Sequence, residues 1–288
     1  MTWKIRGITI IAPSIKDPRV FMICVLITYA IVGQTFLSFD HAWSQILTSL
    51  FISCVVDTGV SYWKTRQIIL PVSGVITGLG LGLLIEAVPL WPFIVAPILA
   101  IGSKAFLKFQ GKHIFNPSNF GLTALLLLFP TTVTTLAAQW SGSLLIVMVI
   151  LMIGGFTSFR VSRWDLVLAF LTSFVIMSFL ENILTQRGAA FVYGPILGAA
   201  FQLFALSMLT DPKTTPNTRS MRVVFGVSIG VIDAILRLWN FQYSLFVALF
   251  FVAACVPIVS VSVPVLRASL HSWRLSRNIT QDAPLISE

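Results

Sequence analysis

The stretch GKHIFNPSNFG, from Gly111 to Gly121, is polar, basic and rich in helix-breaking residues, yet it lies between two apolar runs. The first run covers residues 91–107 and the second covers 122–129. A surface loop does not require so specific a string. We therefore interpret it as a loop that enters a membrane protein and holds a ligand, with a second breaker-rich stretch, TDPKTTP at residues 210–216, as its partner.

The composition is that of an integral membrane protein. Of the 288 residues, 57% are hydrophobic and 10% are charged, and the mean hydropathy is +0.93, whereas soluble domains carry about 25% charged residues. A spanning helix needs about 20 apolar residues. We therefore predict an all-α integral membrane protein with ten transmembrane helices, near residues 20–39, 43–63, 70–85, 90–107, 119–138, 142–157, 165–184, 190–209, 221–238 and 243–266.

The predicted helices form one domain. A cytoplasmic segment at residues 1–19 precedes it, the transmembrane domain covers 20–268, and a flexible cytoplasmic tail covers 269–288. The first segment is basic but lacks the short apolar core and the cleavage site of a signal peptide, so we do not expect it to be removed.

The basic residues predict the orientation. If the N-terminus is inside, all of the 19 Lys and Arg residues except Arg187 and Arg237 fall on the cytoplasmic side. This distribution follows the positive-inside rule and places both termini in the cytoplasm. The net charge of +9 is then a signal of topology rather than of nucleic-acid binding.

Two glycine-rich stretches indicate an internal repeat. SGVITG at residues 73–78 lies in the third predicted helix, and YGPILG at 193–198 lies in the eighth. With five helices in each half, these two helices correspond but run in opposite directions, which is the pattern of an inverted-topology repeat with its site between the halves. Close helix packing explains Gly74 and Gly78 equally well. The predicted repeats cover about residues 20–138 and 142–266.

Charged residues inside the helices have two interpretations each. Asp57 is either a buried functional acid or the partner of Lys64 or Arg66 at the interface. Arg237 follows Asp233 by four residues, so the two either form an ion pair on one helix face or leave Arg237 to contact an anionic ligand. The three cysteines and three histidines are isolated from one another, so no metal site is expected.

Several motifs together resemble one family of membrane redox subunits. The matching pieces are SGVITG at 73–78, Pro89-x-Trp91, Lys104, residues 111–121, Phe129-Pro130, Arg160-x-x-Arg163-Trp164, residues 208–216, and Val224-x-Gly226 through Leu236-Arg237. The chain is similar to the B subunit of the sodium-pumping NADH:quinone reductase and to the D subunit of the Rnf complex. The resemblance implies a ten-helix inverted repeat that carries electrons through riboflavin or FMN in a multi-subunit pump of the bacterial inner membrane.

The sequence departs from this family at the covalent flavin site. One FMN is usually esterified to a threonine in a Ser-Gly-Ala-Thr motif, and that motif occurs nowhere in this sequence. The external loop after Phe129-Pro130 is short, and the segment after Arg237 is altered as well. We therefore regard the chain as a divergent, shortened relative and expect any flavin to be bound non-covalently.

A non-covalent flavin needs flat apolar walls and a few polar groups. The candidate walls are Phe115, Phe120, Trp91 and Trp140. Asn116 and Asn119 offer both donors and acceptors, and Lys112, His113 or a helix N-terminus suits a phosphate or ribityl chain. The full set of candidate flavin-binding residues is Lys112, His113, Phe115, Asn116, Asn119, Gly74, Gly78, Asp211, Thr215 and Arg237.

A simpler interpretation is that Asn116 and Pro117 only begin the fifth helix, as N-cap and first residue. Asp211 and Pro212 repeat this pattern, and we expect residues 210–216 to pack beside residues 111–121.

Three functions follow from these features. The first is a membrane electron-transport subunit that relays electrons through its flavin to other membrane or peripheral redox subunits, without a complete active site of its own. The second is a small-solute permease or channel, because an inverted repeat with broken helices is also a transport architecture. The third is an accessory subunit without a cofactor.

Overall fold

The computed structural model describes residues 2–5, 8–14, 17–36, 42–135, 148, 151–152, 154–156, 158–159 and 162–281, and these are mostly helical. The first half contains α1 (Pro18–Phe36), α2 (Trp43–Thr65), α3 (Val72–Leu84), α4 (Pro92–Phe106) and α5 (Pro117–Leu128). The second contains α7 (Trp164–Thr185), α8 (Ala189–Tyr193), η1 (Gly194–Leu197), α9 (Ala199–Leu203), η2 (Phe204–Met208), α10 (Arg219–Leu238) and α11 (Ser244–Gln281).

The short strands join the ends of helices. β1 (Thr2–Ile5), β2 (Ile8–Ile11) and β3 (Ile68–Ile69) form a three-stranded sheet that ties the N-terminal segment to the turn between α2 and α3. β4 (Ile85–Glu86) pairs with β7 (Thr134–Thr135), and β5 (Lys108–Phe109) pairs with β6 (Lys112–His113) as a hairpin. These strands were not predicted, because two to four residues carry too short a pattern to be recognised in the sequence.

The predicted helices other than the sixth are found as helical segments, and three of them differ clearly from the prediction. Helix five ends at Leu128 instead of 138, and helix eight is broken into α8, η1, α9 and η2. Helix ten continues as α11 to Gln281, so the backbone of residues 269–281 is helical where a flexible tail was predicted. Helix six, predicted at 142–157, and Trp140 lie mostly or wholly outside the described residues.

Three helices in the described part are long and apolar enough to cross a bilayer. They are Trp43–Thr65, Trp164–Thr185 and Ser244–Ser262, and a fourth span results if the segments Ala189–Leu197 and Ala200–Met208, bent by 57°, are counted together. α1, α3, α4 and α5 are apolar but shorter. Several membrane-spanning helices are therefore present, and the count of ten remains a prediction.

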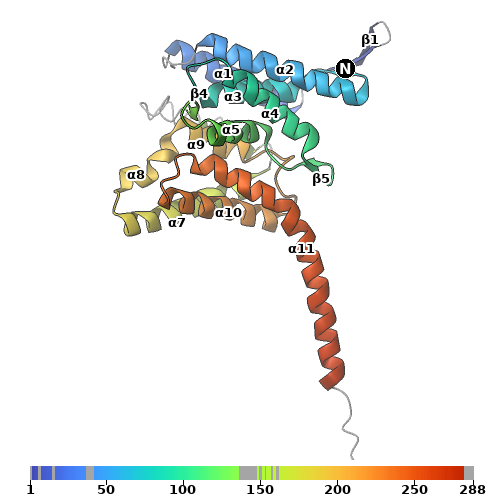
Figure 1. The fold of residues 1–288 in the computed structure, drawn as a ribbon, viewed down its shortest axis with the longest axis vertical. Helices are drawn as coiled ribbons and strands as arrows, with labels where there is room; N and C mark the ends of the chain where they lie inside the picture. Colours follow the sequence, from blue (N-terminus) through green and yellow to red (C-terminus); the bar gives the residue numbers. More distant parts are fainter. Residues whose placement is uncertain are drawn as a thin grey trace, which may run out of the picture.

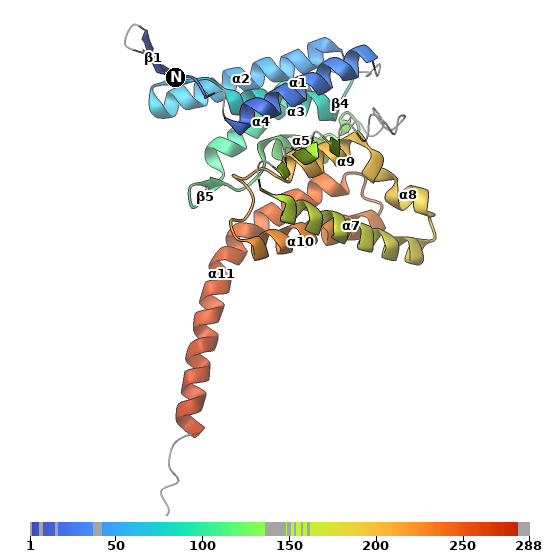
Figure 2. The same cartoon turned by 180° about the vertical axis from the view of Figure 1, so that it is seen from behind.

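The helices form layers. Figures 1 and 2 show α1, α2 and α3 on one side of the molecule, α7 and α10 on the other, and α5 and α9 between them. The C-terminal part of α11 projects away from this body. The buried core joins both halves, because Leu122 and Leu125 of α5, Phe170 of α7 and Ala248 of α11 are all fully buried in one apolar cluster.

Glycines allow the tightest helix contacts. A Cβ atom at Gly78 of α3 would lie 2.6 Å from Leu50 Cα of α2, and one at Gly121 of α5 would lie 2.5 Å from the Ala96 carbonyl oxygen of α4. α10 approaches α7 in the same way, since a Cβ at Gly226 would lie 2.8 Å from the Leu166 carbonyl oxygen. Small residues at these crossings let the backbones come closer than side chains would permit.

Candidate functional site

The two breaker-rich segments meet at Asn116, as the sequence predicted. Asn116 is the N-cap of α5: its side-chain oxygen accepts a hydrogen bond from the Asn119 amide at 3.1 Å, and Pro117 follows as the first helical residue. The Asn116 Nδ2 group donates to the Met208 carbonyl oxygen and to Asp211 Oδ2, both at 3.4 Å. A single side chain thus begins α5 and holds residues 208–211.

The second segment folds around Asp211. Asp211 Oδ1 accepts a hydrogen bond from the Lys213 amide at 3.0 Å, and the Asp211 carbonyl oxygen accepts one from the buried Thr215 hydroxyl at 3.0 Å. Burial raises the pKa of Asp211, while the Lys213 amide and charge and the Asn116 side chain act in the opposite direction. Lys112 completes the junction, because its ammonium group donates to Asn217 Oδ1.

Asn119 connects this junction to the last helix. Its Nδ2 group donates to the Phe246 carbonyl oxygen of α11 at 3.1 Å, and Thr123 donates to the same oxygen at 3.4 Å. Asn119 is only 1% exposed, and its Oδ1 atom has no hydrogen-bond partner within the described residues. Asn119 therefore acts as a link between α5 and α11.

The predicted aromatic walls within the described residues, Phe115, Phe120 and Trp91, do not enclose an open slot. Phe115 stacks on Phe250 of α11 with ring centroids 4.8 Å apart and an angle of 18°, and Phe120 packs against both rings. Trp91 instead packs edge-on against Phe129 at 4.8 Å. The faces expected to hold an isoalloxazine are filled by other phenyl rings, so Phe115 and Phe120 do not fit a flavin ring between them in this arrangement.

His113 borders the same region. Burial lowers the pKa of His113 to about 4, and the nearby charges of Lys104, Lys213 and Lys108 contribute to this shift. Its buried Nδ1 atom has no hydrogen-bond partner within the described residues. His113 is therefore neutral at pH 7, so it can meet a phosphate or ribityl chain as a hydrogen-bonding group but not as a charge.

Gly74 and Gly78 serve helix packing. The hydroxyl of Ser53 donates to the Gly74 carbonyl oxygen at 2.8 Å, and that of Ser49 donates to the Gly78 carbonyl oxygen at 2.9 Å. A side chain at either glycine would collide with α2. Both glycines therefore face α2, which favours the packing interpretation.

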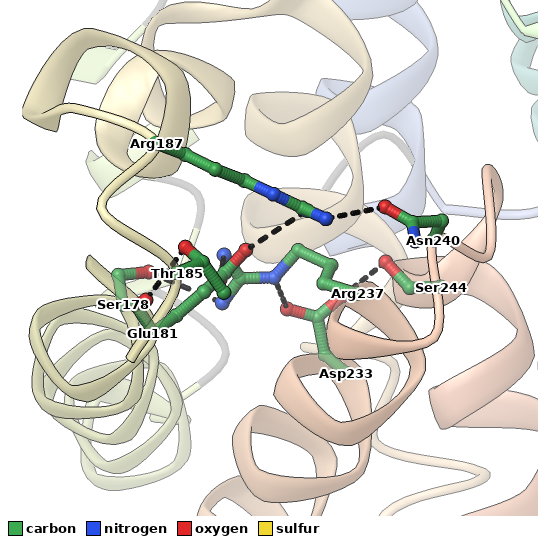
Figure 3. Close-up of polar contacts among 8 residues, drawn as sticks. All are labelled: Ser178, Glu181, Thr185, Arg187, Asp233, Arg237, Asn240 and Ser244. Carbon is green, nitrogen blue, oxygen red and sulfur yellow. Dashed lines mark hydrogen bonds and ion pairs between the residues drawn. The ribbon is translucent and has the colours of Figure 1, made fainter. Parts of the chain in front are cut away.

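Arg237 lies in a buried network of charges, drawn in Figure 3. Its guanidinium group contacts Asp233 Oδ2 at 2.9 Å and also pairs with Glu181 of α7. The Ser178 hydroxyl accepts a further hydrogen bond at 3.1 Å, and the guanidinium carbon lies 4.6 Å from the centroid of the Phe174 ring. The ion pair with Asp233 is confirmed, and the guanidinium is engaged by protein groups rather than left open for an anionic ligand.

The network extends to α11 and to the loop after α7. Ser244 at the start of α11 donates to Asp233 Oδ1 at 2.7 Å. Arg187 lies 3.9 Å from Glu181 Oε1 and donates to Asn240 Oδ1 at 2.5 Å. Glu181 and Asp233 are 2% and 1% exposed, so two buried carboxylates are balanced by two arginines. This network holds α7, α10 and α11 together.

A second ion pair joins α7 and α10 near their first turns. Arg222 makes a forked contact with Asp165, with Nε at 3.0 and 2.8 Å from the two carboxylate oxygens. Arg222 and Arg237 are about 22 Å apart along α10, taking 1.5 Å per helical residue. Their partners Asp165 and Glu181 come in the same order along α7. α7 and α10 therefore run parallel and are joined by ion pairs at both ends.

Comparison with known proteins connects this region to one family. The model of the NQR2, RnfD, RnfE family matches residues 140–265. That part of the chain is related to the NQR2, RnfD, RnfE family. One relative is the D subunit of the ion-translocating oxidoreductase complex of Vibrio atlanticus (strain LGP32), which is 32% identical over 101 residues. The match covers 35% of this chain and 29% of the relative's length.

The resemblance to the NQR2, RnfD, RnfE family that the sequence predicted is thus confirmed, and the chain is an integral membrane protein. The range matched by the family model, residues 140–265, contains the TDPKTTP segment and both ion pairs of α10. The GKHIFNPSNFG segment precedes that range.

Three features escaped the sequence analysis. Glu181 is a further acid inside the apolar helices, overlooked because it lies near the predicted helix end. An acid in an apolar helix was the available signal. Asp57 pairs with neither Lys64 nor Arg66 but with Lys104 of α4 at 2.5 Å, and it accepts a hydrogen bond from the Gly74 amide at 3.0 Å. Phe250 stacks on Phe115 from across the molecule, and no sequence pattern could indicate this.

The junction at Asn116 can be tested by changing charge alone. Asn116→Asp keeps an N-cap acceptor but places a second carboxylate beside Asp211. We therefore expect a lower unfolding temperature and a free energy of unfolding that is smaller by about 1–2 kcal/mol. The double variant Asn116→Asp/Asp211→Asn restores one carboxylate and one amide, and it should recover most of the loss. Thermal unfolding in detergent measures both. Equal destabilisation in the single and double variants would contradict the contact.

Proposed function

We propose that this chain is a membrane subunit of an ion-translocating oxidoreductase complex. The observation that carries the proposal is the family match over residues 140–265, which includes a buried charge network of the kind that membrane proteins retain for function or assembly. The chain then works with other redox subunits, because the relative that it resembles is one subunit of an ion-translocating oxidoreductase complex.

The proposed topology has ten helices in two inverted halves, with both termini in the cytoplasm. Its support is the clustering of basic residues. Arg19, Lys104 and Lys213 border one cavity, and Lys112 and Arg222 both donate to Asn217. Arg187 and Arg237, the two residues assigned to the outer side, belong to a separate network. This separation is what the positive-inside rule requires.

The proposed cofactor is a non-covalent flavin, and its support is the family resemblance. Since the faces of Phe115, Phe120 and Phe250 cover one another, a flavin ring would have to bind outside this cluster. Of the candidate residues, Lys112 remains exposed at the junction of residues 111–121 and 210–216. When bound, a flavin would supply one- and two-electron transfer, and the residues of the junction would orient it.

An absorbance spectrum of the detergent-purified chain between 300 and 600 nm tests the cofactor. We expect a flavin band that moves into the supernatant on acid precipitation, because the sequence has no threonine-ester motif. Asn116→Ala and Asp211→Ala should each lower the flavin-to-protein ratio, and Arg219→Gln, at an exposed position on α10, is the control.

Well-folded protein without any band would contradict the flavin proposal. It would favour a permease, for which the bent segment Ala189–Met208 is the supporting observation, since broken helices line transport sites. Uptake of solutes into proteoliposomes then separates a permease from an accessory subunit.

A further inference from the structure

A cavity lies where the N-terminal strands meet the ends of α2, α3 and α4. Its volume is about 270 Å³. Ile11, Ile69 and Leu70 form an aliphatic wall, and Val72 and Ser73 of the first turn of α3 also border it. Its polar side contains Arg19, Asp57, Ser61, Lys104 and Lys213. The cavity is therefore built from five separate parts of the chain, and it is distinct from the aromatic cluster at Phe115.

The cavity carries an excess of positive charge. Lys104 pairs with Asp57 at 2.5 Å, and Arg19 pairs with Asp17 through a forked contact with Nη2 at 2.6 Å. Lys213 is the third cation, and no ion pair of its ammonium group is found within the described residues. The charges of Asp211 and Asp57 favour the protonated form of Lys213. Asp17 and Asp57 are thus paired with Arg19 and Lys104 rather than with Lys213. The Asp211 carboxylate is already hydrogen-bonded to the Lys213 amide and to the Asn116 side chain.

The charged form of Lys213 is disfavoured in this surrounding of excess positive charge. Burial lowers the pKa of Lys213, and the positive charges of Arg19 and Lys104 lower it further. An anion between the three cations would relieve both effects, since opposite charges within about 4–6 Å favour the charged form. The hydroxyls of Ser61 and Ser73 border the same space and can donate hydrogen bonds to an oxyanion.

We propose that this cavity binds a phosphate group, held between Arg19, Lys104 and Lys213 at the start of α3. A phosphate group fits this cavity better than a carboxylate does, because its oxygens can engage three cations and two hydroxyls together. The volume is below the roughly 300–1,000 Å³ of pockets that enclose whole drug-sized ligands. The cavity therefore takes the phosphate of a larger molecule or free phosphate. A phospholipid headgroup and a soluble phosphate ester share this chemistry.

Thermal unfolding of the full chain in a neutral detergent measures binding of inorganic phosphate, with chloride at equal ionic strength as the reference. A ligand that binds only the folded state raises the unfolding midpoint. We expect phosphate to raise it, and Lys213→Gln to weaken the apparent affinity by about tenfold or more, because a charged hydrogen-bond donor is lost. The matched control is Lys108→Gln, an exposed lysine on β5 that does not border the cavity.

Native mass spectrometry of the same preparations identifies the source of the phosphate. Retained anionic phospholipid that is lost in Lys213→Gln but kept in Lys108→Gln supports a lipid headgroup. A phosphate response without retained lipid supports a soluble phosphate ester. The proposal is overturned if phosphate acts no differently from chloride and lipid retention is equal in the two variants. Lys213→Arg keeps the charge and should preserve binding, which separates loss of the site from loss of folding.

The phosphate site is independent of the flavin proposal. Riboflavin has no phosphate. If Lys213→Gln binds riboflavin as before but no longer binds inorganic phosphate, the result supports both the flavin proposal and the phosphate site. If the absorbance spectrum shows no flavin, inorganic phosphate should still raise the unfolding midpoint.

Discussion

Arg237→Met is expected to destabilise the protein by about 3–5 kcal/mol, because it leaves the buried carboxylates of Glu181 and Asp233 without their shared partner. Methionine retains much of the aliphatic length, so the loss reports on charge rather than on volume. Unfolding in detergent with increasing denaturant measures the effect. Because the network fastens α7 to α10 and α11, we also expect lower yield of folded protein from the membrane.

The neutral triple variant Glu181→Gln/Asp233→Asn/Arg237→Met is the decisive comparison. It removes the charges of Glu181, Asp233 and Arg237 together and leaves only Arg187, whose side chain is 29% exposed. Joint replacement of buried ion-pair partners is often close to neutral, whereas loss of one partner is not. The triple variant should therefore be more stable than Arg237→Met alone. Arg219→Met, at an exposed position on the same helix, controls for loss of a positive charge. A triple variant as unstable as the single one would show that Arg237 acts through packing on Phe174 instead.

Gly78→Ala is expected to have the second largest effect. Its new Cβ atom would lie 2.6 Å from Leu50 Cα and 2.8 Å from the Ser49 carbonyl oxygen, both of which belong to the backbone of α2. Backbone atoms cannot rotate away, so α2 and α3 must separate, at a cost of about 1–3 kcal/mol from overpacking. The hydrogen bond from Ser49 to the Gly78 carbonyl oxygen would be lost as well.

Gly59→Ala is the matched control on α2. A Cβ atom at Gly59 meets nothing within 4 Å, so this change gains the helix propensity of alanine, about 1 kcal/mol, without a collision. The difference in unfolding midpoint between the two variants isolates the close approach of the helices. If both changes stabilise the protein to the same extent, α3 does not pack on α2 in the way described.

The sequence by itself determined the class of the protein and most of its helices. Long apolar runs have few alternatives in a bilayer, because every backbone polar group must be bonded within its own segment. The cap at Asn116-Pro117 was also readable, since the N-cap and first-turn preferences act over three or four residues. The pairing of residues 111–121 with 210–216 was predicted from their shared pattern, and the contact between Asn116 and Asp211 agrees with it.

The tertiary structure decided which side chains meet. Two interpretations of Gly74 and Gly78 were equal in the sequence, and only the position of α2 selected packing. Arg237 was paired correctly with Asp233 because four residues make one helical turn, but Glu181 comes from 56 residues away. The stacking of Phe250 on Phe115 and the meeting of Arg19, Lys104 and Lys213 around one cavity likewise join distant segments. Periodicity describes the surface of one helix, whereas burial, charge balance and cavities arise only where several helices are brought together.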